Sequence, residues 1–203
     1  MGHSRALSAP SGFEIYTVTD DRWDDLERLF GPDGAFNGCW CAFWRLRHKD
    51  FQAADSADRK PLLQDRVEAC DHPPGVLAYR DGEPVAWVSV EPRSRIAAFE
   101  YARVYTSVDD EPLSIISCFY LDDAVRGRGL TSDLLEAVKV HVQRNGGDAV
   151  EGYPEAPEDL GGSDTPGYMG LTPAFERAGF VDIAELADGR SSVQTSGYDD
   201  RRG

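Results

Sequence analysis

The chain has 203 residues, enough for one domain with a substantial buried core, and 41% of them are hydrophobic. No apolar run approaches the roughly 18 residues that a membrane helix needs, so we expect no membrane partner. The formal net charge of −15 repels nucleic-acid phosphates, which argues against nucleic-acid binding and favours cationic partners.

The two ends of the chain are polar and lack strong structural signals. The N-terminus has no apolar segment of the kind that a secretory signal contains, so we expect a cytoplasmic protein. We expect residues 1–12 to be a disordered lead-in, residues 13–195 to form a single domain, and residues 196–203 to be a frayed tail.

The first third of the chain predicts one strand and three helical segments. Residues 13–18 are rich in β-forming side chains and predict a strand, and the apolar spacing in residues 20–30 predicts a helix. The aromatic block 36–47 also has helical spacing. The polar stretch 49–60 predicts a loop, and residues 61–69 predict a helix with a proline in its first turn.

The middle of the chain has the clearest local signals. Two β-rich runs, 76–80 and 84–90, flank Asp81-Gly82 and predict a hairpin. Residues 114–121 are almost all apolar and predict a buried central strand. Residues 130–145 predict a helix with one apolar face, formed by Leu130, Leu134, Leu135, Val138 and Val142.

Shorter elements follow in the last third of the chain. The patterns predict a strand at 149–153, a short helix at 172–178, and final strands at 181–186 and 192–195. The order of strands and helices predicts a mixed α/β protein.

A glycine-containing turn joins the central strand to the helix after it. Its sequence is Arg126-Gly127-Arg128-Gly129-Leu130-Thr131. Glycines let the backbone approach a bulky anion, the start of a helix offers unpaired N–H groups, and the arginines add positive charge. The turn therefore predicts a phosphate-binding site, although glycines can also simply turn a strand into a helix with solvated arginines.

This turn resembles the R/Q-x-x-G-x-G/A signature of the GNAT superfamily of N-acetyltransferases. The hairpin, central strand and leucine-rich helix follow that family's order, and residues 175–180 look like its late helix-Gly-Phe segment. The resemblance implies an α+β GNAT acyl-CoA N-acyltransferase fold, in which a mixed, mostly antiparallel sheet is flanked by helices.

The resemblance also implies acetyl-CoA as cosubstrate. Backbone groups of Arg126, Gly127, Arg128, Gly129, Leu130 and Thr131 would hold its pyrophosphate. The strand edge at Phe119, Tyr120 and Leu121 would pair with the pantetheine arm. One departure is Thr131, where the family prefers Gly or Ala.

The implied activity is transfer of an acetyl group to a primary amine of a small or cationic acceptor, by direct attack in a ternary complex. Phe175 stands where many family members carry a tyrosine that protonates the departing thiolate. A protein that binds acyl-CoA without turnover is therefore the alternative. The oligomeric state is left open, with a homodimer as one option.

Direct transfer needs a proton acceptor for the amine and a proton donor for the thiolate. The candidates are Tyr153, Tyr168 and Glu151, with Glu151 on the same strand face as Tyr153. Each of these side chains could instead have a packing or capping role. His141 falls on the polar side of its helix, where we expect it to be exposed.

The aromatic block offers Trp40 and Trp44, whose faces could line a pocket for a cationic amine or simply pack a helix against the core. Residues 38–45 resemble an uncharacterised bacterial branch of the same superfamily.

The four cysteines are Cys39, Cys41, Cys70 and Cys118. They are too few for a disulfide framework and fit a reducing compartment as thiols. A zinc site built with His72 is an alternative, but the cysteine spacing is tight for structural zinc, and we expect no metal.

Overall fold

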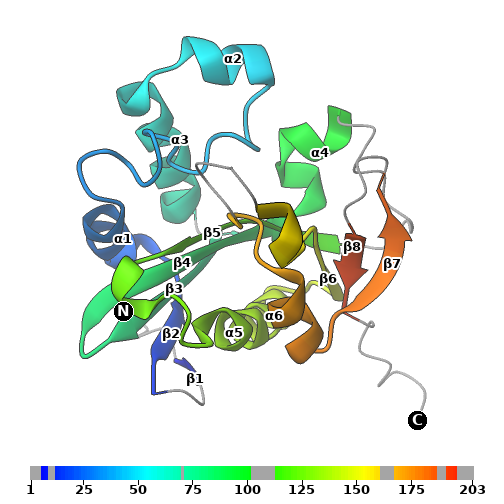
Figure 1. Ribbon diagram of the computed structural model, residues 1–203. Coiled ribbons are helices and arrows are strands. Elements are labelled where there is room, and N and C mark those ends of the chain that lie inside the picture. The colour runs from blue at the N-terminus through cyan, green and yellow to red at the C-terminus, as the bar shows by residue number, and fades with distance from the viewer. Residues whose placement is uncertain are drawn as a thin grey trace.

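An eight-stranded sheet runs through the protein and separates two layers of helices (Figure 1). The computed structural model describes residues 6–8, 12–69, 71–101, 113–160, 167–186 and 191–195. The strand order is β1-β2-β3-β4-β5-β6-β8-β7, and every neighbouring pair is antiparallel except β5 and β6. The mixed, mostly antiparallel sheet expected from the sequence is confirmed.

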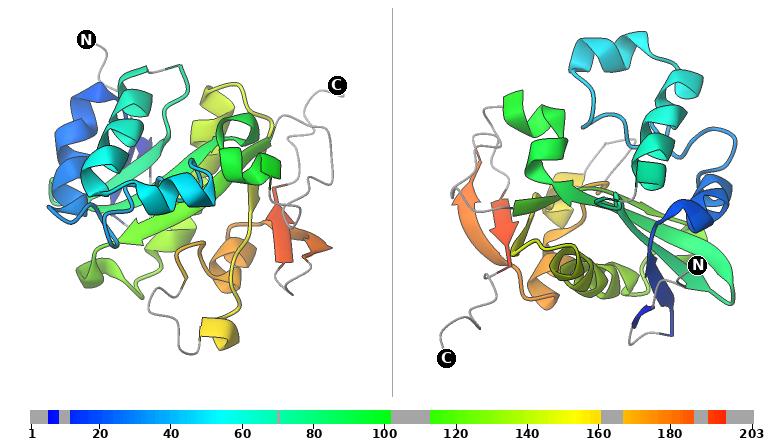
Figure 2. Two further views of the ribbon diagram at one scale, coloured as in Figure 1. Left: turned by 90° about the horizontal axis from the view of Figure 1, so that it is seen from above. Right: turned by 180° about the vertical axis from the view of Figure 1, so that it is seen from behind.

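The strands are β1 Leu7–Ser8, β2 Glu14–Thr17, β3 Gly75–Arg80, β4 Glu83–Pro92, β5 Leu113–Leu121, β6 Ala149–Gly152, β7 Val181–Glu185 and β8 Ser191–Gln194. The helices are α1 Trp23–Phe30, α2 His48–Ala53, α3 Ser56–Ala69, α4 Ala97–Tyr101, α5 Leu130–Arg144 and α6 Thr172–Arg177. Helices α5 and α6 lie on one side of the sheet, and α1 to α4 lie on the other (Figure 2).

The predicted hairpin is confirmed as β3 and β4. Asp81 and Gly82 both have positive φ, at 52° and 83°, and Arg80 pairs with Glu83 across the turn. Two left-handed residues in succession match the twist of the flanking strands, which is why an Asp-Gly pair joins them.

Helix α5 is confirmed with the apolar face that the sequence predicts. The buried residues on that face are Leu130, Leu134, Leu135, Val138 and Val142. The expectation for His141 was wrong, because its ring is buried and its Nδ1 lies 3.0 Å from the hydroxyl of Thr17. Helix α5 contacts strands β1 to β4 and also β6, so residues on its polar side are covered by protein as well.

The aromatic block is not a helix. Residues 31–47, which we call the aromatic loop, form a series of turns, and both Trp40 and Cys41 have positive φ. The aromatic spacing instead reflects burial from several sides, because Trp40 stacks on Trp23 and contacts Phe30. Helical periodicity alone does not distinguish these cases.

The loop expected at 49–60 was also wrong. It contains α2 and the first turn of α3, so Pro61 lies inside α3 rather than in its first turn. Asp55 and Asp58 explain the earlier start, because each carboxylate accepts the backbone N–H of the other, at 3.0 and 3.1 Å. This reciprocal pairing is a capping box with aspartate in place of the usual glutamate.

Part of the expected lead-in is ordered. Leu7 pairs with Ile15 in β1 and is buried, so the expectation of disorder was wrong for Leu7 and Ser8. The expected tail 196–203 lies outside the described residues.

Strands β5 and β6 part after a short stretch of pairing. Residues 113–115 of β5 pair with residues 149–151 of β6, whereas β4 follows β5 as far as Leu121. A bulge at Ser117 accompanies the parting, since Ser89 pairs with Cys118 and Val90 with Ile116. The rest of β5 therefore presents an edge that β6 does not cover, and we call this space the strand opening.

Candidate active site

The glycine turn lies beside the strand opening, at the start of α5. Gly127 and Gly129 have φ of 71° and 83°, and a Cβ built on either would meet nothing within 4 Å. Gly129 is the N-terminal cap of α5, so the N–H groups of the first helical turn point away from the helix body. Open space and unpaired donors at a positive helix end fit a phosphate group.

Charges around the turn are mixed. Arg126 and Arg128 are both exposed, and Arg126 is bound to Asp123 at 2.6 Å. The Arg126 Nε also donates to the carbonyl of Leu121 at 3.1 Å, which ties the turn to the end of β5. Thr131, in the first turn of the helix, is half-buried.

The exposed edge of β5 is partly occupied by the protein itself. The N–H of Phe119 donates to the carbonyl of Tyr168 at 2.7 Å. The N–H of Asp122 donates to Val85 in β4, and backbone direction alternates along a strand, so Tyr120 also faces β4. The prediction that a ligand pairs with the backbone of Tyr120 is therefore wrong. Phe119 and Leu121 are the residues whose backbone faces the strand opening.

Phe175 reaches into this region from α6. Its ring is fully buried and meets Phe119 edge-on at 6.1 Å between centroids. A Cβ on Gly152 or Gly170 would lie 2.3 or 2.6 Å from the Phe175 ring, so both positions require glycine. The ring therefore fills the space between β5 and the end of β6 and offers no proton donor there.

Glu151 and Tyr153 form a buried polar group with Arg93 and Ser192, which we call the Glu151 cluster. Glu151 accepts from the Tyr153 hydroxyl at 2.8 Å, from the Ser192 hydroxyl at 2.6 Å and from Arg93 at 3.4 Å. Arg93 also donates to the Tyr153 oxygen at 3.2 Å. Burial, followed by the charge of Glu151, raises the pKa of Tyr153 above its usual range. The Tyr153 proton is thus committed to Glu151.

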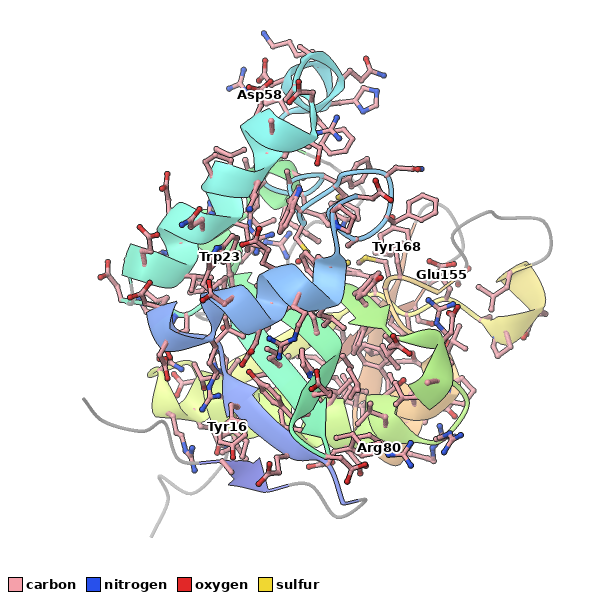
Figure 3. All side chains as sticks on the ribbon, turned by 90° about the vertical axis from the view of Figure 1, so that its left-hand side faces the viewer. Tyr16, Trp23, Asp58, Arg80, Glu155 and Tyr168 are labelled. Carbon is pink, nitrogen blue, oxygen red and sulfur yellow. The ribbon has the colours of Figure 1, made fainter. Side chains whose placement is uncertain are left out.

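Tyr168 is placed differently from Tyr153. It is half-buried, its backbone is held against β5, and its ring stacks on Trp44 with centroids 6.4 Å apart. Figure 3 shows Tyr168 next to the aromatic loop, with Glu155 on the segment that follows β6. The two predicted tyrosines therefore pack in one apolar cluster but differ in the surroundings of their side chains: the Tyr153 hydroxyl is bonded to Glu151 and Arg93, whereas Tyr168 is half-buried beside the strand opening.

The two predicted tryptophans lie in different places. Trp44 packs against Phe99 of α4 at 5.2 Å and shares a cluster with Tyr153. Trp40 belongs to the core between α1 and the sheet, and its Nε1 donates to Ser56 at 3.0 Å. Trp40 therefore does not line the same site as Trp44.

A buried ion cluster that the sequence did not indicate holds the aromatic loop to the sheet. Arg45 donates to Glu91 through Nε at 2.8 Å and to Ser89 at 2.9 Å, and Arg66 of α3 binds the other oxygen of Glu91 at 2.5 Å. Neither charge stands out in the sequence, since Arg45 follows an aromatic run and Glu91 ends an apolar strand.

A separate cavity of about 490 Å³ lies at the far end of α5, away from the glycine turn. Its lining includes Arg93, Glu91 and His141. It contains none of the site residues predicted from the sequence.

In the part of the chain that the structure describes, no group of three His, Cys, Asp or Glu side chains is placed to hold a metal ion. None of the described helices combines the length and apolar character needed to cross a bilayer.

The fold is shared with solved structures of low sequence identity. A structure of aminoglycoside acetyltransferase AAC(6')-Ib with coenzyme A and kanamycin has 17% identity, a TM-score of 0.52, and coverage of 91% of this chain and 94% of that one. YncA, a putative acetyltransferase from Salmonella typhimurium with its cofactor acetyl-CoA, has 14% identity, a TM-score of 0.55, and coverage of 95% and 97%. An uncharacterized protein from Bacillus halodurans has 15% identity, a TM-score of 0.57, and coverage of 95% and 90%.

Sequence comparison is more specific about the family. No curated protein sequence is significantly similar to the chain. The family model described as the acetyltransferase (GNAT) family matches residues 40–153, more than half of the chain, and this match includes the glycine turn and the strand opening. The chain therefore belongs to the GNAT family of acetyltransferases.

Proposed function

We propose that this protein transfers an acetyl group from acetyl-CoA to the primary amine of a small or cationic acceptor. The observation that carries the proposal is the open glycine turn at the start of α5 beside the uncovered edge of β5. Membership of the GNAT family of acetyltransferases supports the same function. Acetyl-CoA would supply the activated acetyl thioester.

The pyrophosphate would lie at the first turn of α5, bound by backbone N–H groups from Gly127 to Thr131 and screened by Arg126 and Arg128. The pantetheine arm would run along β5 and bond the carbonyl of Phe119 and the N–H of Leu121, because these groups face the strand opening. The Phe119 N–H already donates to the carbonyl of Tyr168, so its role would be to hold the Tyr168 loop against β5.

Tyr168 is the proposed donor to the departing thiolate. Its loop is bonded to β5 at Phe119, and its ring lies beside Trp44, which would wall the acceptor site. Glu151 and Tyr153 are proposed as positioning residues, because both are buried and hydrogen-bonded to each other and to Arg93.

An amine acceptor agrees with the overall charge of −15, which attracts cations. The solved AAC(6')-Ib complex contains kanamycin, which makes aminoglycosides a reasonable first class to test alongside polyamines and amino acids. Direct attack in a ternary complex, a cytoplasmic location and a homodimer remain predictions.

The decisive experiment measures release of free coenzyme A thiol from acetyl-CoA across that acceptor panel. Replacing Gly129 with glutamate should weaken coenzyme binding by at least about tenfold, because it adds bulk and negative charge at the helix N-terminus. Calorimetry or a thermal shift with coenzyme A measures the affinity.

Gly146 supplies a matched control at the other end of the same helix. It also has positive φ, at 81°, and open space around a built Cβ. Gly146→Glu should therefore carry the same backbone strain and charge but leave coenzyme affinity unchanged. Equal affinity in wild type and Gly129→Glu would place the coenzyme elsewhere.

A second candidate function rests on Phe175. Its ring fills the space between β5 and β6 without a proton donor, so a protein that binds acyl-CoA without turnover is also consistent with the site. Tight coenzyme binding with no thiol release for any acceptor in the panel would favour this function over catalysis.

A further inference from the structure

The cavity of about 490 Å³ lies where β4 ends, β5 begins and α5 ends, and we call it the end cavity. The glycine turn is at the opposite end of α5, so the two places are separate. Pockets that hold small organic molecules have volumes of roughly 300 to 1,000 Å³. The apolar part of the lining includes Val90, Pro92, Phe99, Leu113 and Val142.

The Ser114 hydroxyl gives the end cavity a buried polar group without a partner. Ser114 is 6% exposed, lines the cavity, and forms no side-chain hydrogen bond with the described residues. The end of α5 lies over it, because a Cβ built on Gly147 would be 3.4 Å from the Ser114 Oγ. Leaving a buried hydroxyl unbonded costs free energy, so a ligand that bonds to it gains affinity.

The strongest acceptors around the end cavity are already engaged. The Glu91 carboxylate is bound by Arg45 through one oxygen and by Arg66 through the other. The last carbonyls of α5, from residues 141–143, accept the backbone N–H groups of residues 145–147. A ligand that offers only donors would therefore compete with bonds that the protein makes to itself.

The donors in the lining are less fully used. The Arg93 side chain is 18% exposed, and its three hydrogen bonds within the protein are long, at 3.2, 3.4 and 3.5 Å. An N–H···O bond is usually about 2.9 Å long, so this guanidinium can still bind an anion. His72 is half-buried in the lining, and its ring bonds to none of the residues that the structure describes.

The charge at this end of the sheet also favours an anion. Three arginines, Arg45, Arg66 and Arg93, stand against two glutamates, Glu91 and Glu151, in the ion pairs around the end cavity. The C-terminal end of α5 contributes roughly half a negative charge, which offsets only part of this surplus. The end cavity is therefore locally positive in a protein with a net charge of −15.

We propose that the end cavity binds a small organic carboxylate. Ser114 pairs with Pro92, the residue before Arg93, so the hydroxyl and the guanidinium extend from neighbouring positions on β5 and β4. The carboxylate would bind between these two side chains, and the apolar part of the ligand would pack against Phe99, Leu113 and Val142.

The test titrates the full chain with 3-phenylpropionate in a calorimeter. Its amide, 3-phenylpropionamide, is the neutral probe of the same size. The acid should bind at least about tenfold more tightly than the amide, because only the acid carries the charge that Arg93 binds. The measurement uses neither acetyl-CoA nor an acceptor, so its outcome does not depend on the proposed function.

Nuclear magnetic resonance locates the bound acid. The backbone amide signals of Ser114, Asn145 and Gly147 should shift on binding, whereas those of Gly127 and Gly129 should not. Shifts confined to the glycine turn would place the acid at the proposed coenzyme site and would overturn the proposal.

Three variants test the side chains. Ser114→Ala removes a hydroxyl that the protein does not use, so it should fold normally and bind the acid about fivefold more weakly. Ser117→Ala is the matched control, since Ser117 lies on the same strand but bonds to Ser89 outside the end cavity, and its affinity should equal that of wild type. Arg93→Gln should remove the preference for the acid over the amide.

The proposal is overturned if the acid and the amide bind equally, if neither binds, or if Ser114→Ala and Ser117→Ala bind the acid alike. Circular dichroism checks the fold of each variant. Wild type and Ser114→Ala suffice for the test, so it does not depend on the folding of Arg93→Gln.

Discussion

Tyr153 and Tyr168 carry the same hydroxyl but differ in what it can reach. The Tyr153 hydroxyl is enclosed with Glu151 and Arg93, whereas Tyr168 is half-buried beside Trp44 and the strand opening. An acid must lie close to the atom it protonates, so geometry favours Tyr168 even though the sequence gives no reason to choose.

The first prediction compares the two tyrosines. Tyr168→Phe should lower kcat by about 100-fold, since general acid catalysis typically contributes that much, and should leave stability little changed. Tyr153→Phe should have a smaller effect on kcat and should cost about 1 kcal/mol of stability, because Glu151 loses a donor. Steady-state kinetics across pH and urea unfolding measure both quantities. A large loss of kcat in Tyr153→Phe without loss of stability would reverse the assignment.

His141 carries the second prediction, which concerns stability against pH. Burial is the main reason that the pKa of His141 falls to about 4, while its Nδ1 lies within hydrogen-bond distance of Thr17. Below about pH 6.5 the unfolded chain takes up a proton that the folded protein excludes. The free energy of unfolding should therefore fall as pH drops from about 6.5 to about 4, by up to roughly 3 kcal/mol from this residue.

Urea unfolding at pH 7 and pH 4.5 measures the effect. His141→Gln keeps a neutral hydrogen-bonding side chain and cannot titrate, so its stability should depend less on pH than that of wild type. Identical pH dependence in the two proteins would contradict the assigned role of His141.

Among the structural elements, the aromatic loop depends most on contacts outside itself. It has no regular hydrogen-bonded structure, and it is attached to β4 through Arg45 and to α4 through the bond from the Ala98 N–H to the Trp44 carbonyl. These attachments hold the loop where Trp44 stacks on Tyr168.

The third prediction tests the attachment at Arg45. Arg45→Met should cost about 3 to 5 kcal/mol, because it leaves the buried Glu91 with one cation fewer. Arg66→Met should cost less, since the Arg66 side chain is 27% exposed whereas that of Arg45 is 3% exposed. Urea unfolding measures each variant.

A double variant separates an unpaired charge from lost packing. Combining Arg45→Met with Glu91→Leu should recover much of the stability, because no buried carboxylate remains. Losses that simply add would show that the ion cluster does not act as a unit.

At the scale of the whole molecule, two charge requirements oppose each other. The net charge of −15 would attract the proposed cationic acceptor but would repel coenzyme A, whose phosphates would have to be held locally at the proposed site at the start of α5. The exposed Arg126 and Arg128 stand where this local compensation is needed.

The fourth prediction follows from the long-range field. At saturating acetyl-CoA, kcat/KM for a polyamine should fall by roughly tenfold as salt rises from about 0.05 to 0.3 M, because salt screens the attraction. For an amino acid acceptor with no net charge, kcat/KM should change much less. Equal salt dependence for the two acceptors would exclude steering by the net charge.

Elements with local signals could be predicted from the amino-acid sequence. The Asp81-Gly82 hairpin, the apolar face of α5 and the glycine turn are each specified by residues within a few positions of one another, and all three lie where the sequence predicts. Backbone conformation at a turn or along one helical face depends mainly on neighbouring residues, so the coenzyme site could be proposed before the fold was known.

Contacts between residues far apart in the chain could not be predicted in this way. The strand opening depends on how far β5 and β6 stay paired, and this determines that Tyr120 faces β4 while Phe119 contacts Tyr168. Trp40 and Trp44 lie in different core clusters, and this too depends on contacts with distant parts of the chain. The ion pair of Arg45 with Glu91 joins positions far apart in the chain, and no local pattern encodes such a contact, because it depends on strand order and packing.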